Sequence, residues 1–112
     1  MDITPTQIVA ELYRIQTEAA KGVAALYDAE CKLADCEYDY DRTLQLAFME
    51  SQGTVADRTA ISRLKAAEAR LAADLAKAEF NRIKLKLKQL ELAQMSTQTI
   101  ARQLETELKV LR

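Results

Sequence analysis

Apolar and small residues recur along the first half of the chain at alternating intervals of four and three positions. Spacing of this kind places one side chain per turn on a single face of an α-helix and is typical of coiled coils. It predicts a long first helix, from about residue 5 to about residue 51. We call the ten positions the first seam: Ile8, Leu12, Ile15, Ala19, Gly22, Leu26, Ala29, Leu33, Cys36 and Tyr40.

The start of this helix carries capping residues, and its middle carries one weak point. Thr4 and Gln7 flank Pro5 and can form a capping box around a proline at the first helical position. Gly22 costs a helix about 0.5 to 1 kcal/mol relative to alanine, so a bend there is one interpretation. The alternative is that small residues spaced seven apart, Gly22, Ala29 and Cys36, let another helix approach closely.

Residues 51–54 form the strongest turn signal in the chain. Gly53 can adopt a positive φ at the end of the first helix, and Thr54 can cap the next helix with Asp57 three residues later. A second helix is therefore expected over about 55–95, and its many alanines favour close helix contact. Polar residues around Ser96 could cap a separate C-terminal helical segment over about 97–111. The predicted fold is all-α, a long antiparallel, coiled-coil-like helical hairpin forming one domain over 1–112.

The second helix is apolar on two opposite sides. At 100° per residue, Ile83, Leu87 and Leu90 share one side, whereas Leu85 and Leu92 continue an opposite stripe from Leu64, Leu71 and Ala78. A helix of this kind needs two neighbours. One can be the first helix, and the other is most economically another subunit, so we expect a homo-oligomer. The candidate interface residues are Ile83, Leu85, Leu87, Leu90 and Leu92.

Composition narrows the possible functions. The 112 residues include no histidine and two cysteines, Cys31 and Cys36, which lie too far around one helix to bridge each other easily and are expected to be buried, reduced thiols. A zinc site or a histidine-based triad within one chain is therefore disfavoured, and we expect neither a cofactor, a small-molecule substrate nor enzymatic activity. Because a signal peptide and a long apolar run are missing, we expect a soluble, cytoplasmic protein without a membrane partner.

The net charge of −1 hides a division between the two halves. Residues 1–53 carry four basic and ten acidic side chains, whereas residues 54–112 carry twelve basic and seven acidic ones. Arg63, Arg70, Lys77 and Lys84 recur every seven residues, and Lys88, Arg102 and Lys109 roughly extend their line. This line could bind a polyanion such as single-stranded nucleic acid. The alternative is charge pairing with the acidic half or with another subunit.

Residues 37–41 alternate acid and tyrosine, which raises the question of a metal site. On a helix, Glu37 and Asp41 share a side while Asp39 points away, so the cluster offers a pair of ligands rather than a cage. A solvated acidic face is the favoured interpretation. Tyr38 could stack on a base if it is exposed, whereas Tyr40 belongs to the first seam and is expected to pack.

Residues 38–102 resemble small helical proteins from the recombination modules of bacteriophages. The similar features are residues 38–42, the apolar run 44–49, Gly53, the helix entry 56–60, the run 85–92 and the segment 97–102. This organisation is similar to the UvsY-type recombination mediators. The resemblance implies a helical-hairpin oligomer in the cytoplasm of the host cell that binds single-stranded DNA and helps to load a recombinase onto strands covered by single-strand-binding protein. The phosphate contacts that it implies are Arg58, Arg63, Arg70, Lys77, Lys84, Lys86, Lys88 and Arg102.

Other functions fit the same architecture. A coiled-coil structural or adaptor protein, such as a virion assembly factor or an inhibitor of a host protein, would use the seams for protein contacts alone. If the basic line faces the acidic half, the adaptor gains support, whereas a basic line on an open ridge favours the DNA-binding protein. A secreted hairpin of the WXG type fits the size, but Gln52 stands where that motif has tryptophan.

Overall fold

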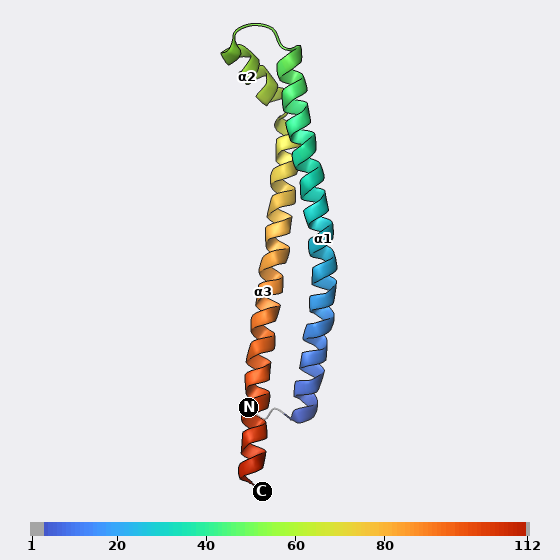
Figure 1. Ribbon diagram of the computed structural model, residues 1–112, viewed down its shortest axis with the longest axis vertical. Helices are drawn as coiled ribbons and strands as arrows, with labels where there is room; N and C mark the ends of the chain where they lie inside the picture. Colours follow the sequence, from blue (N-terminus) through green and yellow to red (C-terminus); the bar gives the residue numbers. More distant parts are fainter. Residues whose placement is uncertain (1–3, 112) are drawn as a thin grey trace. The chain divides into compact units, whose positions relative to one another are not determined.

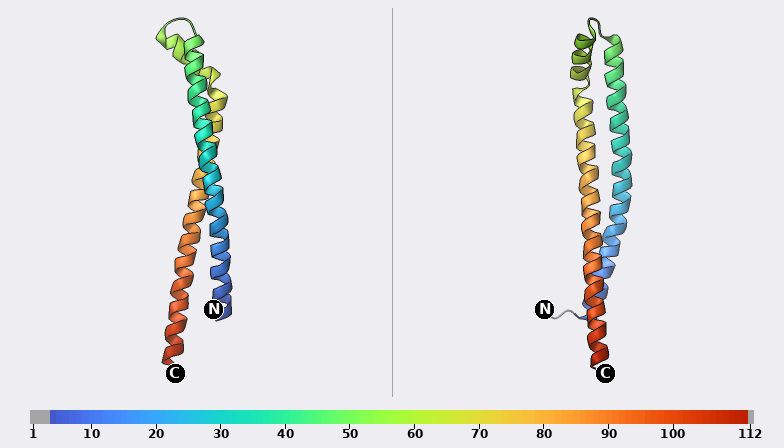
Figure 2. Two further views of the ribbon diagram at one scale, coloured as in Figure 1. Left: turned by 45° about the vertical axis from the view of Figure 1, so that its right-hand side comes forward. Right: turned by 60° about the vertical axis from the view of Figure 1, so that its left-hand side comes forward.

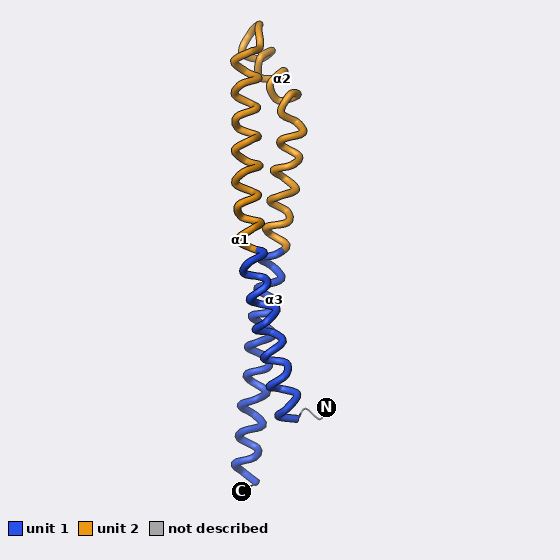
Figure 3. Tube along the Cα trace, turned by 90° about the vertical axis from the view of Figure 1, so that its right-hand side faces the viewer, with its two compact units in different colours: residues 1–25, 83–112 blue, residues 26–82 orange. Residues whose placement is uncertain are grey.

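The computed structural model describes residues 4–111, which form three α-helices and no strand within that range. Helix α1 spans Pro5–Glu50, α2 spans Val55–Lys65 and α3 spans Ala67–Val110 (Figure 1). Contacts divide the chain into two compact units (Figure 3). Unit 1 combines residues 1–25 with 83–112, and unit 2 is residues 26–82. In each unit a part of α1 packs against an antiparallel part of α3, which confirms the all-α helical-hairpin fold.

The first seam is the buried edge of α1. All ten predicted positions are buried or half-buried, and Ile15 is the most enclosed large side chain of the described residues. The facing positions of α3 follow the same four-and-three spacing, including Ala73 and Ala76 in unit 2 and Leu87 in unit 1. The heptad pattern therefore predicted which face of α1 is covered.

Gly22 does not break α1, which is continuous from Pro5 to Glu50. It is instead a site of close helix approach in unit 1. A Cβ placed on Gly22 would overlap the Cδ2 atom of Leu87 and lie 3.2 Å from its Cγ atom. The close-approach interpretation is confirmed at this position, since an absent side chain makes room for the leucine of α3.

The helix starts form as the sequence predicts. At the start of α1, the Thr4 amide donates to Gln7 Oε1 (2.9 Å) and the Gln7 amide donates to Thr4 Oγ1 (3.2 Å). At the turn, Gly53 has a φ of 115°, and Thr54 and Asp57 form the reciprocal bonds of a capping box at the start of α2. These bonds satisfy amides that the first helical turn leaves without partners.

The expected boundaries of the second helix are wrong in two places. The helix is interrupted at Ala66, which is 0 % exposed and separates α2 from α3, and α2 is tilted against the first turns of α3 (Figures 1 and 2). The interruption lies four residues after Ser62, which is 2 % exposed and whose hydroxyl donates to the Thr59 carbonyl (2.9 Å).

No separate C-terminal segment forms, because α3 continues through residues 95–99. The hydroxyls of the threonines predicted as caps instead donate hydrogen bonds to backbone carbonyls within the helix. Thr97 Oγ1 donates to the Ala93 carbonyl (2.9 Å) and Thr99 Oγ1 donates to the Met95 carbonyl (3.0 Å). A threonine that bonds the carbonyl four residues earlier can stay in a helix interior instead of capping a new one.

Candidate functional site

The predicted basic line is divided by the break at Ala66. Arg63 lies on α2, whereas Arg70, Lys77 and Lys84 lie on α3. Heptad spacing aligns side chains only along one continuous helix. Arg63 therefore leaves the line.

Arg58, one of the predicted phosphate contacts, is bonded within the turn between α1 and α2. Its Nε and Nη2 atoms donate to the Phe48 carbonyl at 3.2 and 3.0 Å, and its guanidinium lies 4.3 Å from the centroid of the Phe48 ring. The bonds satisfy a carbonyl in the last turn of α1 and tie α1 to α2. No sequence pattern indicates this contact, since the two residues are ten positions apart across a turn.

Arg70 and Lys77 lie among carboxylates in unit 2. Together with Ala73 they line a shallow hollow of about 440 Å³ whose other residues are Glu37, Tyr40, Asp41 and Asp74. The Nε atom of Arg70 is 3.9 Å from Asp74 Oδ2. In this part of the chain the basic line thus faces the acidic residues of α1, which is the arrangement that favours protein contacts.

A basic residue of α1 also interacts electrostatically with an acidic residue of α3 at a second place in unit 2. The pKa of the Glu79 carboxyl is lowered mainly by its hydrogen bonds from Arg82 (2.7 and 3.1 Å) and to a smaller extent by the charge of Lys32 on α1. In unit 2, α1 therefore contributes a basic residue and α3 an acidic one, so the charges are not divided simply into an acidic α1 and a basic α3.

The remaining candidates lie in unit 1, where the charge balance is reversed. The described residues of unit 1 carry seven basic and five acidic side chains, against eight and eleven in unit 2. Residues 83–90 contain three exposed lysines and no acid. At 100° per residue, Lys84 and Lys88 share one flank of α3 and Lys86 occupies another. Arg102 lies about four to five helical turns beyond these lysines, and with Gln103 and Thr106 it lines a shallow hollow.

The candidate oligomer interface separates into two groups. Ile83, Leu87 and Leu90 are half-buried and belong to the face of α3 that packs on α1 within unit 1. Leu85 and Leu92 are 58 % and 57 % exposed on the opposite face. The second group is therefore the more exposed of the two.

Helix α1 also carries an exposed apolar stripe that the sequence analysis missed. In unit 1 it contains Val9, Tyr13 and Val23, and in unit 2 it contains Tyr27 and Tyr38. Most of its members follow a second four-and-three spacing, displaced from the first seam. This signal was present in the sequence but was hidden by the stronger seam.

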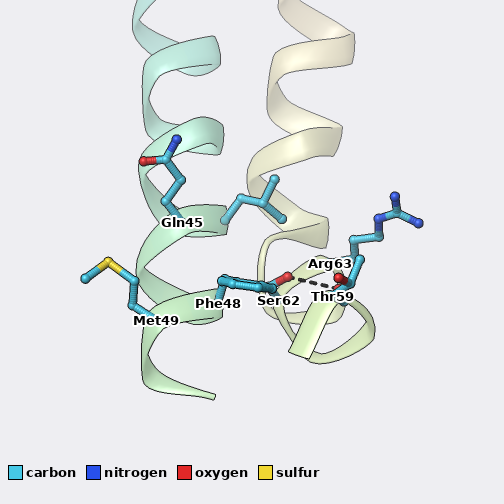
Figure 4. Close-up of a pocket in the computed structure, with 7 residues that line it drawn as sticks. Gln45, Phe48, Met49, Thr59, Ser62 and Arg63 are labelled. Carbon is cyan, nitrogen blue, oxygen red and sulfur yellow. Dashed lines mark hydrogen bonds between the residues drawn. The ribbon is translucent and has the colours of Figure 1, made fainter. Parts of the chain in front are cut away.

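A further hollow of about 440 Å³ lies in unit 2 beside the turn (Figure 4). It is lined mainly by apolar groups of α1 and by residues of α2: Leu44, Gln45, Phe48, Met49, Thr59, Ser62 and Arg63. The Thr59 hydroxyl donates to the Val55 carbonyl (2.8 Å), and the Ser62 hydroxyl donates to the Thr59 carbonyl (2.9 Å). Arg63 is thus the only charged lining residue, and Figure 4 shows its guanidinium pointing away from the hollow, to solvent.

The cysteines and tyrosines differ in environment. Both cysteines are free; Cys36 is half-buried in the first seam, whereas Cys31 is exposed, so its predicted burial was wrong. A hydrogen bond with Cys31 raises the pKa of Tyr27. Tyr40 packs in the seam as expected, and Tyr38 is exposed.

Neither a metal site nor a membrane span is found in the part of the chain that the structure describes. Within residues 4–111, no three histidine, cysteine or acidic side chains are grouped as metal ligands. None of the described helices combines the length and apolar character needed to cross a bilayer.

Comparisons with known proteins returned no match. No family model, no curated protein and no solved structure is significantly similar to the chain.

Proposed function

We propose that the protein is a non-enzymatic scaffold of associating helical hairpins that binds single-stranded DNA along the part of α3 that belongs to unit 1. It would act as a recombination mediator or accessory protein of the UvsY type. The observation that carries this proposal is the stretch 83–90, with three exposed lysines and no acidic residue. Phosphates gain Coulomb energy and release counterions at such a stretch.

Exposure and bonding support some of the candidate contacts for DNA more than others. Lys84, Lys86, Lys88 and Arg102 are exposed, whereas Arg58 is bonded to the turn and Arg70 and Lys77 lie among carboxylates. If several subunits of one oligomer each made a weak phosphate contact, the contacts together would raise the overall affinity for DNA through multivalency. The exposed leucines Leu85 and Leu92 offer a surface for that assembly. A recombinase and a single-strand-binding protein are the protein partners that this function would involve.

Fluorescence polarization with labelled oligo-dT tests the proposal. The wild type should bind at 50 mM salt and weaken at 200 mM. A double variant, Lys86→Gln with Lys88→Gln, should bind more weakly and reduce the slope of log K against log salt by about 1.4, at about 0.7 for each lost phosphate contact. The matched control, Lys21→Gln with Lys65→Gln, removes the same charge elsewhere and should change little. Equal effects of both pairs, or binding without salt dependence, would contradict the proposal.

A second candidate is a coiled-coil adaptor or structural protein that acts through protein contacts alone. It is favoured by the acidic surroundings of Arg70 and Lys77 and by the two exposed apolar stripes. Light scattering with and without oligo-dT separates the candidates. An oligomer whose mass is unchanged by oligo-dT supports the adaptor. A monomer whose mass is unchanged by oligo-dT contradicts both candidate functions.

A further inference from the structure

We propose that the hollow beside the turn in unit 2 binds a peptide segment of a partner protein in which a large apolar side chain lies next to carboxylates. The hollow is formed where the last turns of α1 meet α2, and its lining is mainly apolar around Phe48 and Met49 (Figure 4). Its volume of about 440 Å³ is in the range of small ligand pockets. This site is separate from the lysines proposed to bind DNA.

The hollow is preformed, because both of its walls are fixed to each other. Two hydrogen bonds from Arg58 hold the Phe48 carbonyl, and the same guanidinium lies over the Phe48 ring. The α2 wall is held at its start by the capping box of Thr54 and Asp57. A preformed apolar site loses less conformational entropy when a ligand binds.

The polar groups of the hollow determine which apolar ligand fits. The Thr59 and Ser62 hydroxyls both donate to backbone carbonyls and are satisfied within α2. Arg63 is the only charged lining residue, and it forms no ion pair among the described residues. Arg63 is exposed, and its long side chain can turn its guanidinium to a carboxylate at the mouth while an apolar side chain occupies the interior.

The charge around α2 favours the same ligand. This helix carries Arg58, Arg63 and Lys65 against a single acid, Asp57, whose carboxylate is engaged in the capping box. An acidic segment is therefore attracted to this end of the unit, and a basic one is repelled. The combination of an apolar interior and a cationic rim selects a segment with both properties rather than one with either alone.

Fluorescence polarization with three labelled probe peptides tests the inference. Gly-Gly-Asp-Asp-Phe should bind with a dissociation constant on the order of 100 µM, as expected for one buried side chain and one rim contact. Replacing its Phe by Ala, or both Asp by Lys, should weaken binding at least tenfold. Equal binding of the Ala peptide or of the Lys peptide would overturn the proposal, as would no binding of the first peptide at 1 mM.

Exposed residues supply variants that leave the fold intact, which circular dichroism can check. Arg63→Glu should weaken binding of the acidic peptide at least tenfold, whereas Lys65→Glu, the same charge change on a residue of α2 that does not line the hollow, should weaken it by a clearly smaller factor. Met49→Ala should weaken binding about threefold or more, against no change for Met95→Ala, another exposed methionine. Equal effects within either pair would contradict the assignment.

Two further measurements separate this inference from the other proposals. Lys86→Gln with Lys88→Gln should leave peptide binding unchanged, and Met49→Ala should leave oligo-dT binding unchanged. If Met49→Ala and Arg63→Glu instead alter the mass of the peptide-free protein by light scattering and no peptide binds, the hollow is a contact between copies of this chain and the inference fails.

Discussion

Replacing Gly22 by alanine sets helix propensity against packing. In an exposed helix this change stabilises by about 1 kcal/mol, since alanine loses less backbone entropy. At Gly22 the new methyl group would overlap Leu87 Cδ2 and come within 3.2 Å of Leu87 Cγ. Leu87 must rotate from its rotamer, at about 0.5 to 1.5 kcal/mol, and overpacking adds about 1 kcal/mol or more. We expect Gly22→Ala to destabilise by about 1 kcal/mol net.

Urea unfolding followed by circular dichroism measures this balance, at one protein concentration because association shifts apparent stability. The control Ala24→Gly, on an exposed position of α1, should cost about 1 kcal/mol from propensity alone. In a Leu87→Ala background the overlap is gone, so Gly22→Ala should stabilise by about 1 kcal/mol. The sign of the effect should therefore reverse. Stabilisation of the wild type by Gly22→Ala would refute the close approach of α1 and α3.

The remaining predictions concern the turn and the surface charges. Arg58→Ala should destabilise by about 1 to 2 kcal/mol through the loss of the Phe48 carbonyl bonds and the ring contact, and Arg58→Lys should recover only part of this in urea unfolding. Thr54→Ala should cost about 1 kcal/mol in the same assay, whereas Thr54→Asp should cost little because aspartate also caps helices. Hydrogen bonds from arginine lower the pKa of Glu11 and of Glu79, so their stabilisation is present above the ordinary carboxyl pKa and is lost as pH falls through the lowered one. Helicity followed by circular dichroism should decline on acidification in that window, and Glu79→Gln should remove part of the decline; a pH-independent signal would contradict this.

Periodicity predicted the parts of the fold that depend on one face of one helix. The first seam is covered at every position from Ile8 to Tyr40, because a heptad pattern reports directly which side chains share a face. The capping boxes at Thr4 and Thr54 were equally predictable, since they depend on residues three positions apart. Local spacing is sufficient where the physical cause is local.

The break at Ala66 and the contact of Arg58 with Phe48 could not be read in this way. Helix propensity around residue 66 is high, and the interruption accompanies a buried serine whose hydroxyl bonds the preceding turn. Arg58 reaches across the turn to a carbonyl ten residues away, so its role depends on how α2 is placed against α1. Both features lie in unit 2, and both change the setting of arginines that were predicted as phosphate contacts.

The stretch 83–90 joins the two properties on which the proposed function depends. Leu85 is exposed between Lys84 and Lys86, so a second copy that docked the same stripe on it would bring lysines of two chains together. These lysines repel each other, and salt screens the repulsion. Association through this stripe should therefore strengthen with salt, whereas DNA binding should weaken. A bound strand would neutralise the same lysines and, by linkage, favour the assembled form at low salt. If the mass without DNA does not rise with salt, a different surface covers Leu85, and the exposed apolar stripe of α1 becomes the next candidate.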